Sequence, residues 1–352
     1  MNNIRVHTES PYEILVGSDL LRSCGQEIAK VHAPCRAAII TDDTVDSLYG
    51  AQTEASLRAA GYQVCKFVFA HGERSKCLQT VLDAYEMLTA NGISRSDLIV
   101  ALGGGVVGDL AGFVAATYLR GVDFVQIPTT FLAAIDSSVG GKTAVDIPSG
   151  KNLVGAFWQP KQVICDTDTL STLSEEIFSE GTAEAIKYGA ILDESLYRLL
   201  ASGGLSSHLE EVICRCVDLK RMLVEEDERD RGSRQLLNFG HTLGHCVETL
   251  SGYTVPHGRA VAIGMAMITR VSESLGLTPA GTTQDLLSVL DTYRLPSQYE
   301  GATVQQFFQV ALGDKKRHGD SLTVVLLERI GKAVLHPIPL SELESFLSHA
   351  WN

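Results

Sequence analysis

The chain has 352 residues, enough for two domains, and its 45% hydrophobic and 20% charged residues are ordinary for a globular protein. The formal net charge of −13 disfavours nucleic acid and anionic membranes as partners, although a local basic cluster could still bind an anionic small molecule. There is no run of eighteen apolar residues and no signal-peptide pattern, so a cytoplasmic protein without a membrane partner is expected. The eight scattered cysteines are expected to be reduced.

In the first half of the chain, short β-branched runs alternate with helical patterns. Strands are predicted at 36–40, 63–70, 98–102, 123–129 and 162–167. A helix between the second and third strands has Ser75 as its predicted N-cap and Gly92 just after its end. This alternation predicts an α/β domain over residues 1–167, with a mostly parallel sheet covered on both faces.

After residue 168 nearly every segment has helical periodicity, broken by Gly, Ser and Pro. The stretch "LTVVLLERIGKAVLHPI" predicts a hairpin that turns near Gly331. Residues 168–352 are therefore predicted to form a second, mainly helical domain. Because active sites favour domain junctions, the cleft between the halves is where a site is expected.

Three glycines indicate a nucleotide-binding turn. Gly103, Gly105 and Gly108 follow a predicted strand in G-x-G-x-x-G spacing, where backbone N–H groups can approach a pyrophosphate. The ribose-binding acid usually follows by about 20 residues. Asp123 has that spacing but precedes its strand, whereas Asp42 directly follows an earlier strand. Asp42 is the better candidate, which implies a different strand order; a tight turn without a ligand is the alternative.

The segment "SSVGGKTAVD" ends like a phosphate-binding P-loop, but Asp136 stands where its first glycine is needed. A carboxylate there would repel phosphates, so an ATP site is rejected. The polar residues Asp136, Lys142, Asp146, Lys151 and Asn152 nevertheless gather in a glycine-rich connection. A solvated loop is the alternative, although the apolar "LVGAFW" that follows argues against free exposure.

The stretch "LNFGHTLGHCVE" places His241 and His245 four residues apart on one face of a predicted helix. With Glu184 and His257 they could form a catalytic zinc site of two imidazoles and a carboxylate. Two core histidines, or one ligand beside one acid–base group, are the alternatives. For Glu184 and Lys187, three apart, the alternative is a surface salt bridge, but the mostly apolar helix argues against it.

Cationic side chains accumulate outside these motifs, at Arg120, Lys220, Arg234 and in "DKKRHG". Each alone is typical of a solvated surface. A substrate that carries both phosphate and carboxylate would give them a common purpose.

Several motifs in order resemble the 3-dehydroquinate synthases of the shikimate pathway, which belong to the sugar-phosphate cyclase superfamily. These motifs are "GERSK", "LGGGVVGDLAGFVAATYLRG", "IPTTFLAAIDSSVGGKTAVD", "GKNLVGAFWQP", "AEAIKYG", "LNFGHTLGHCVE", "PHGRAVAIGM" and "DKKRHG". The resemblance covers nearly the whole chain. It implies an NAD-binding domain, a helical metal-binding domain, substrate between them, zinc or cobalt as the metal, and a homodimer.

The resemblance also implies the reaction, which turns 3-deoxy-D-arabino-heptulosonate 7-phosphate into 3-dehydroquinate and phosphate. The metal lowers the pKa of the carbon-5 alcohol, NAD transiently oxidises it, and phosphate then leaves by β-elimination. The departing phosphate itself can take the proton from carbon 6. The hydride then returns and an aldol reaction closes the ring, so NAD is not consumed.

Site residues follow from the resemblance motif by motif. The implied metal ligands are Glu184, His241 and His257. The implied cofactor-binding residues are Asp42, Glu73, Lys76, Gly104, Gly105, Val106, Asp109, Thr129, Thr130, Leu132, Lys142, Lys151, Thr169, Thr172 and Leu173. The implied substrate-binding residues are Arg120, Lys142, Lys151, Asn152, Lys187, Lys220, Arg234, Asn238, His245, Lys315 and Lys316. The implied catalytic residues are Asp136, Lys142, Lys187, Asn238 and His245.

Within this set, the resemblance gives groups of residues separate tasks. Lys220 and Arg234 hold the substrate carboxylate, and Arg120 reaches in from a neighbouring subunit. The phosphate is surrounded by Lys142, Asn152, Asn238 and His245.

One position departs from the family pattern. Ile177 stands before Phe178 where an acid is common, with Glu176 one position earlier. If that acid helps to hold the nicotinamide end of the cofactor, the contact is lost or rerouted.

Five other functions compete with this interpretation. The 2-deoxy-scyllo-inosose and valiolone synthases share the metal triad but need no carboxylate clamp, whereas an aminodehydroquinate synthase keeps it. A glycerol dehydrogenase-like polyol dehydrogenase would release NADH at each turnover. A nucleotide-binding regulator with an inactive site is the non-enzymatic alternative.

Overall fold

The computed structural model describes residues 1–313 and 317–351, which fall into two compact units. Unit 1 comprises Met1–Ser174 and Cys216–Arg229, and unit 2 comprises Glu175–Arg215 and Asp230–Asn352. The sequence analysis drew one boundary, at residue 167. The structure instead assigns most of helix α8 (Leu209–Glu226) to unit 1, although unit 2 precedes and follows it in the chain.

Unit 1 is built on a seven-stranded sheet in the order β1-β2-β9-β6-β5-β3-β4. Only β1 and β2 pair antiparallel, and the other neighbours pair parallel. The strands are β1 Asn2–Val6, β2 Tyr12–Gly17, β3 Arg36–Asp42, β4 Gln63–Phe69, β5 Leu98–Gly103, β6 Asp123–Pro128 and β9 Gln162–Asp166. The five predicted strands are β3, β4, β5, β6 and β9, so the mostly parallel α/β sheet is confirmed.

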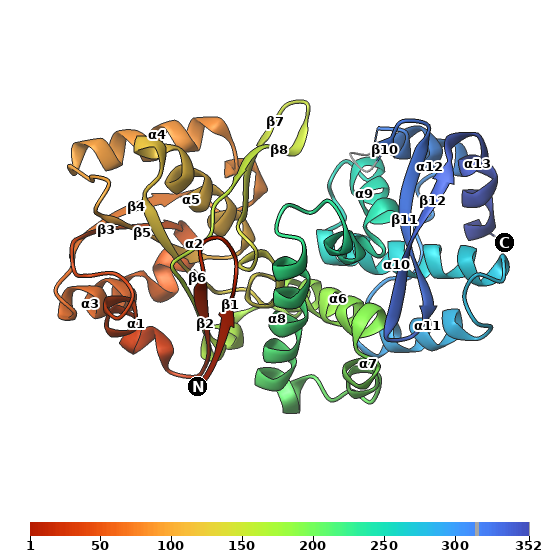
Figure 1. Cartoon of the computed structure of the whole chain (residues 1–352), viewed down its shortest axis with the longest axis horizontal. Coiled ribbons are helices and arrows are strands. Elements are labelled where there is room, and N and C mark those ends of the chain that lie inside the picture. Colours follow the sequence, from red (N-terminus) through yellow and green to blue (C-terminus); the bar gives the residue numbers. More distant parts are fainter. Residues whose placement is uncertain (314–316, 352) are drawn as a thin grey trace. The chain divides into compact units, whose positions relative to one another are not determined.

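Helices cover both faces of this sheet, as expected for parallel strands (Figure 1). One core joins α4 and α5 to residues such as Ile40 and Ile99, and a second joins α1 and α3 to residues such as Ile39 and Val100. Neighbouring strand residues thus point to opposite cores. The helices are α1 Leu20–Ala29, α2 Asp43–Val45, α3 Ala51–Ala59, α4 Leu78–Ala90 and α5 Gly105–Thr117.

The predicted N-cap of α4 was wrong. Ser75 lies in a 3₁₀ turn, Glu73–Ser75, and the extended residue before the helix is Cys77. Gly92 does follow the helix end, with φ of 64°.

The polar segment after β6 is not a simple loop. A π-helical turn, Ala133–Ser137, leads into the antiparallel hairpin of β7 (Lys142–Ile147) and β8 (Gly150–Phe157). The backbone N–H of Asp146 in β7 donates to the Lys76 carbonyl oxygen at 2.8 Å. The hairpin is therefore attached to the "GERSK" segment.

Unit 2 is mainly helical, as predicted. Its helices are α6 Glu175–Leu192, α7 Glu194–Ala201, the first part of α8, α9 His241–Leu250, α10 His257–Ser274, α11 Thr282–Thr292, α12 Val304–Ala311 and α13 Leu340–Ser348. A small antiparallel sheet contains β10 Arg317–His318, β11 Ser321–Arg329 and β12 Lys332–Pro339, in that order. Gly331, with φ of 80°, lies in the predicted turn between β11 and β12.

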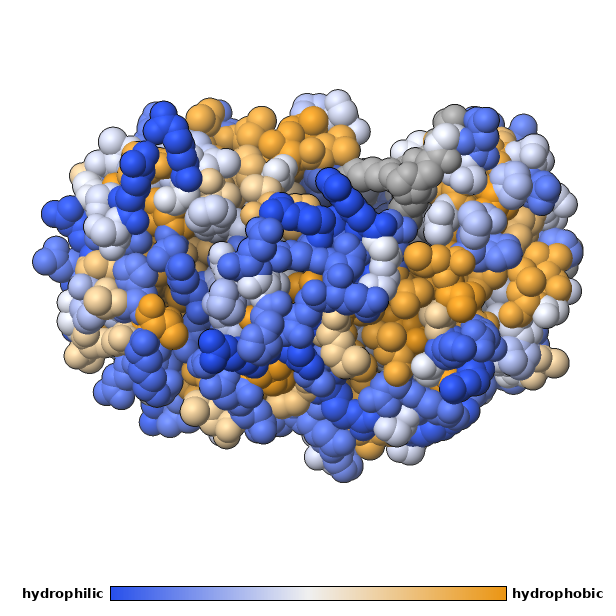
Figure 2. Space-filling view, viewed as in Figure 1, coloured by the Kyte–Doolittle hydropathy of each residue, from blue (hydrophilic) through white to orange (hydrophobic). Residues whose placement is uncertain are grey.

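The surface carries both polar and apolar side chains. They are interspersed over the face drawn in Figure 2, as is normal for folded domains, whose accessible surface is more than half apolar. Among the described helices, none is both long enough and apolar enough to span a membrane.

Candidate functional site

The strand order of unit 1 creates a reversal point between β3 and β5. The chain runs outward from β3 to the edge strand β4, then returns to β5 on the other side of β3 and continues to β6. Connections after β3 and β5 therefore lead in opposite directions, and in open α/β sheets ligands bind at the carboxyl ends of the strands where this happens. Thr41 pairs with Leu102, so Asp42 lies beside the glycine turn that follows β5. This order explains why the better ribose candidate precedes the glycines.

The glycine turn is closely packed against the chain that follows β6. A Cβ on Gly104 would lie 2.9 Å from the Thr130 side chain, and one on Gly108 would lie 2.7 Å from the Gln126 side chain. Thr129 N–H donates to the Gly103 carbonyl oxygen at 3.0 Å. Among the described residues no side chain caps the first turn of α5, and free N–H groups at a helix N-terminus are of the kind that can bind anions.

The other predicted cofactor residues lie on the same sheet edge. Val106 and Asp109 are in the first turns of α5, and Leu132 follows Thr129 and Thr130 after β6. Thr169, Thr172 and Leu173 follow β9, the neighbour of β6. The Tyr49 hydroxyl donates to the Thr169 carbonyl oxygen at 2.9 Å and lies 2.6 Å from the Thr172 hydroxyl oxygen, which connects the segments after β3 and β9.

A charge network around the buried Lys76 lies beside the glycine turn. The Lys76 ammonium is 2.5 Å from the Asp109 carboxylate and 3.9 Å from that of Glu73, and Glu73 is 3.8 Å from the Lys151 ammonium. Burial alone would lower the pKa of Lys76, but the carboxylates of Asp109 and Glu73 outweigh it and raise the pKa. Lys76 therefore stays a cation in a buried position.

Predicted substrate residues of unit 1 lie on the hairpin and on α8. Lys142 begins β7 and is exposed; Asn152 has φ of 54° and donates its backbone N–H to the Asp146 carboxylate at 2.8 Å. The buried Lys220 ammonium contacts the Asp136 carboxylate and donates to its carbonyl oxygen at 2.6 Å. Arg120 is exposed, with φ of 67°, just after α5.

In unit 2, glycines let three helices approach each other at backbone distance. A Cβ on Gly264 of α10 would lie 1.9 Å from the Gly240 carbonyl oxygen, just before α9. A Cβ on Gly258 of α10 would lie 2.4 Å from Glu180 Cα of α6. Only glycine fits at such contacts. This packing brings together Glu184 of α6 and the first residues of α9 and α10, which are His241 and His257.

These three residues form a compact set of donor atoms. Glu184 Oε1 lies 3.4 Å from His241 Nε2 and 3.5 Å from His257 Nε2, and the possible ligand atoms all lie within 4.8 Å of one another. Glu184 is 0% exposed, and its carboxylate also lies against the buried Lys187 ammonium. Such a buried carboxylate between two imidazoles fits a divalent cation.

The electrostatics of the cluster support the same fit. Burial alone would lower the pKa of His257, but hydrogen bonds to Glu184 and Glu248 outweigh it and raise the pKa to about 10. The carboxylates of Glu184 and Glu248 thus place negative charge around this imidazole. A divalent cation would satisfy the same negative charge.

The remaining predicted residues of unit 2 differ in their surroundings. Lys187 is 1% exposed against Glu184, so the surface salt-bridge alternative is wrong. Arg234 is buried, and the Asn238 amide donates to the Gln235 carbonyl oxygen at 3.0 Å; both lie in the 3₁₀ helix that leads into α9. His245 is exposed, with its ring centre 5.6 Å from that of His241.

Three other positions complete this comparison with the sequence analysis. Ile177, at the position that is commonly acidic, is exposed, and so is Glu176. Lys315 and Lys316 lie outside the described residues.

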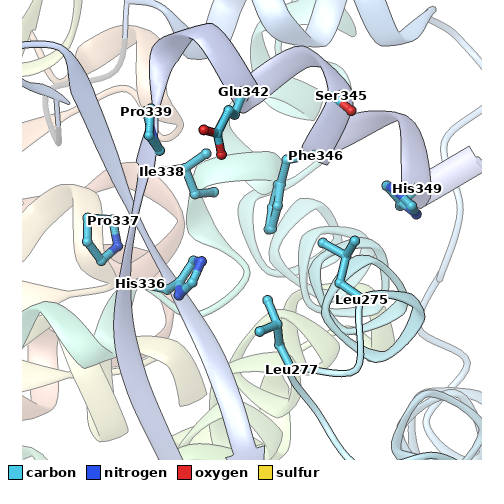
Figure 3. Close-up of a pocket in the computed structure, with 10 residues that line it drawn as sticks. All are labelled: Leu275, Leu277, His336, Pro337, Ile338, Pro339, Glu342, Ser345, Phe346 and His349. Carbon is cyan, nitrogen blue, oxygen red and sulfur yellow. The ribbon is translucent and has the colours of Figure 1, made fainter.

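A separate groove of about 550 Å³ lies between the end of α10, strand β12 and α13 (Figure 3). Leu275, Leu277, Ile338 and Phe346 supply apolar walls, and the His336 ring stacks on Phe346 with centroids 6.4 Å apart. Its lining residues include none of the predicted site residues. The groove is therefore not the candidate site.

The fold, the glycine turn of unit 1 and the Glu184 cluster of unit 2 together define a class of protein. A reversal point with a glycine turn is typical of a nucleotide-binding sheet, and a buried Glu-His-His cluster is typical of a divalent-metal site. Residues 66–180 match the family model "3-dehydroquinate synthase N-terminal", and residues 181–317 match "3-dehydroquinate synthase C-terminal". The chain belongs to the 3-dehydroquinate synthase family.

Similar proteins support this membership. The chain is 45% identical to a 3-dehydroquinate synthase from Enterococcus faecalis, over 96% of each chain, and 46% identical to one from Streptococcus gordonii, over 96% of this chain and 97% of that one. A solved 2-deoxy-scyllo-inosose synthase in complex with carbaglucose-6-phosphate, NAD+ and Co2+ is 27% identical, with a TM-score of 0.88 and coverage of 98% and 99%. A 2-epi-5-epi-valiolone synthase from Streptomyces hygroscopicus with NAD+ and Zn2+ bound is 28% identical, with a TM-score of 0.88 and 99% coverage of both chains.

Proposed function

We propose that this protein is an NAD- and divalent-metal-dependent carbon–oxygen lyase. It converts 3-deoxy-D-arabino-heptulosonate 7-phosphate into 3-dehydroquinate and phosphate, the second step of the shikimate pathway. The single observation that carries the proposal is the Glu184, His241 and His257 cluster, in a chain 45% identical to a 3-dehydroquinate synthase over 96% of its length.

The proposed metal ligands are Glu184, His241 and His257. A divalent cation bound there would supply Lewis acidity to a substrate hydroxyl, which eases removal of its proton. Lys187 supports this role because its ammonium lies against Glu184 and balances part of the buried charge. His257 is the more exposed imidazole, with a third of its side chain accessible, so the cluster is open on that side.

The proposed NAD site is the carboxyl edge of the sheet in unit 1. Asp42 would bind the adenosine ribose, and the N-terminus of α5 at Gly104 and Gly105 would bind the pyrophosphate. NAD supplies a hydride acceptor when it is bound. The proposal is supported by the closeness of Asp42 to the glycine turn and by the two solved relatives whose titles name NAD+.

The proposed substrate contacts divide by charge. Lys142, Asn152, Asn238 and His245 would hold the phosphate, where cationic and amide donors stabilise the leaving group. Lys220 and Arg234 would hold the carboxylate. Lys220 supports this task because its buried ammonium is already oriented by Asp136.

Two further parts of the proposal concern the assembly. The protein would act as a cytoplasmic homodimer, with Arg120 of each subunit reaching the substrate of its neighbour. The exposure of Arg120 supports such a reach. Size-exclusion chromatography with light scattering tests the dimer, and Arg120→Ala tests the contact through a raised KM.

The decisive experiment measures phosphate release from 3-deoxy-D-arabino-heptulosonate 7-phosphate, with and without NAD and with and without a chelator. The proposal expects release that needs both NAD and metal, with no net NADH. Steady NADH production from a simple polyol, without phosphate release, would instead favour a polyol dehydrogenase. A glycerol dehydrogenase from Schizosaccharomyces pombe shares this fold at 16% identity and a TM-score of 0.67. The amino analogue of the substrate, run in parallel, tests the aminodehydroquinate alternative.

A further inference from the structure

Glu248 is a buried carboxylate of unit 2 that has been given no role so far. It lies in α9, three residues after His245, and is 5% exposed. Its Oε2 is 3.5 Å from Nδ1 of His257 and 4.0 Å from Nε2 of His245. One buried acid therefore contacts a proposed metal ligand and a proposed catalytic side chain.

The neighbouring ligand shows what such a contact does. His241 Nδ1 lies 3.1 Å from the Phe239 carbonyl oxygen. A carbonyl oxygen can only accept, so Nδ1 carries the proton and Nε2 keeps its lone pair. That Nε2 faces Glu184 Oε1 at 3.4 Å. The backbone at Phe239 thus fixes the tautomer in which His241 can bind a cation.

His257 has the same arrangement with a different acceptor. Its Nε2 faces Glu184 at 3.5 Å, and its Nδ1 faces the Glu248 carboxylate at the same distance. We propose that Glu248 is a positioning residue that accepts from Nδ1–H of His257 and holds its Nε2 toward the metal. This inference rests on the proposed metal-dependent function. Unlike the Phe239 carbonyl group, Glu248 can be changed by mutation.

A direct metal-binding role for Glu248 has to be distinguished from the positioning role. His245, Glu248 and His257 also form a group whose possible ligand atoms lie within 4.8 Å of one another. Glu248 could therefore be a direct ligand at a second metal position. A ligand and a positioning residue differ in how much metal binding is lost and in whether the metal's coordination changes.

The test compares the full-length wild type with Glu248→Ala, Glu248→Gln and Glu184→Ala. Zinc affinity is measured by competition with a chromophoric chelator, and the visible spectrum is recorded after loading with cobalt. The expected loss for Glu248→Ala is about 10–100-fold in affinity, the usual effect of removing an outer-shell partner of a ligand. Glu248→Gln should lose less, because its amide oxygen still accepts from Nδ1–H but carries no charge.

Glu273→Gln is the matched control. Glu273 lies in α10, sixteen residues after His257 and so about 24 Å along the helix, and it accepts from the backbone N–H groups of Gly281 and Thr283. The affinity of the Glu273→Gln variant for zinc should equal that of the wild type. Excess zinc should restore most of the activity of Glu248→Ala, which loss of a merely structural contact would not allow. Melting curves of the metal-free proteins identify variants that fail to fold, and Glu248→Gln keeps the test valid if Glu248→Ala does fail.

Three outcomes would overturn the inference. Zinc affinity of both Glu248 variants within about threefold of the control would show that the carboxylate does not orient His257. Loss of zinc as complete as in Glu184→Ala, with an altered cobalt spectrum in Glu248→Gln, would make Glu248 a ligand. Failure of the wild type to bind any divalent metal would refute the proposed function as well.

Discussion

The two candidate sites differ in how fully their buried charges are paired. In unit 1, buried cations lie against carboxylates, as in Lys76 with Asp109 and Lys220 with Asp136. In unit 2, Lys187 pairs with Glu184, but a second buried carboxylate, Glu248, also lies against the imidazole of His257. The charges of unit 1 are thus paired before any ligand binds, whereas the cluster of unit 2 gathers negative charge that a further cation would balance.

The sites also differ in what builds them. The proposed nucleotide site would use backbone N–H groups at a glycine turn, together with side chains from several strand ends. The metal cluster depends on three side chains from three helices. Single substitutions should therefore have graded effects in unit 1, except where they remove a charge that contacts the reacting group, and near-complete effects at the three proposed ligands of unit 2.

The largest effect is expected from Glu184→Ala. Loss of a ligand should abolish zinc binding. It should also lower kcat/KM on the order of 10³–10⁴-fold, which corresponds to several kcal/mol in activation free energy. Metal content by mass spectrometry and phosphate release measure the two effects. Glu175→Ala is the control, because its carboxylate lies on the same helix and is 93% exposed. Retention of stoichiometric zinc by Glu184→Ala would exclude Glu184 as a ligand.

Lys142→Ala tests the case in unit 1 in which a substitution removes a charge that contacts the reacting group. Removal of a cation at the departing phosphate should lower kcat by about 10²–10³-fold and leave the metal content unchanged. Lys161→Ala is the matched control, since this half-exposed lysine lies 3.4 Å from Asp123. Loss of metal from Lys142→Ala would mean that its role has been misassigned.

Gly264→Ala tests the packing that assembles the metal cluster without changing any ligand. The new Cβ would overlap the Gly240 carbonyl oxygen, so α9 and α10 must move apart, at a cost of about 1–3 kcal/mol in the free energy of unfolding. Zinc affinity should fall with it, by roughly tenfold. Denaturant unfolding and chelator competition measure both. Gly313→Ala is the control, since no atom of the described residues would lie closer than 3.4 Å to its Cβ. Unchanged zinc affinity in a destabilised Gly264→Ala would separate the packing from the site.

The sheet of unit 1 could be predicted from the sequence because its central strands are buried on both faces. Leu98–Gly103 is buried throughout, which leaves a continuous apolar run in the sequence. The β7–β8 hairpin could not be predicted in the same way. Its residues mix polar, apolar and glycine positions and are mostly only partly buried, and its attachment to Lys76 depends on a contact between distant segments.

The metal cluster was only partly accessible to sequence reasoning. The spacing of His241 and His245 showed a shared helix face but not which imidazole meets Glu184, because that depends on how Gly258 and Gly264 bring the helices together. The resemblance to a family supplied the choice of Glu184, His241 and His257. Glu248 received no role, although its position three residues after His245 on the same helix face was the available signal.

The smallest effect on turnover is expected at Asp42, where two roles of one carboxylate can be separated. Asp42 Oδ1 accepts from Val45 N–H at 2.8 Å and so caps the helix that follows β3. Asn is an equally good cap and Ala is not, so only Asp42→Ala should lose about 1 kcal/mol of stability. Asp42→Ala and Asp42→Asn both lose the charged acceptor for a ribose hydroxyl, worth about 1.5–3 kcal/mol. Both should therefore raise the KM for NAD by roughly tenfold or more. Turnover at saturating NAD should stay close to that of the wild type. A raised KM in Asp42→Ala alone would assign the carboxylate to the helix cap and leave the ribose to another residue of this edge.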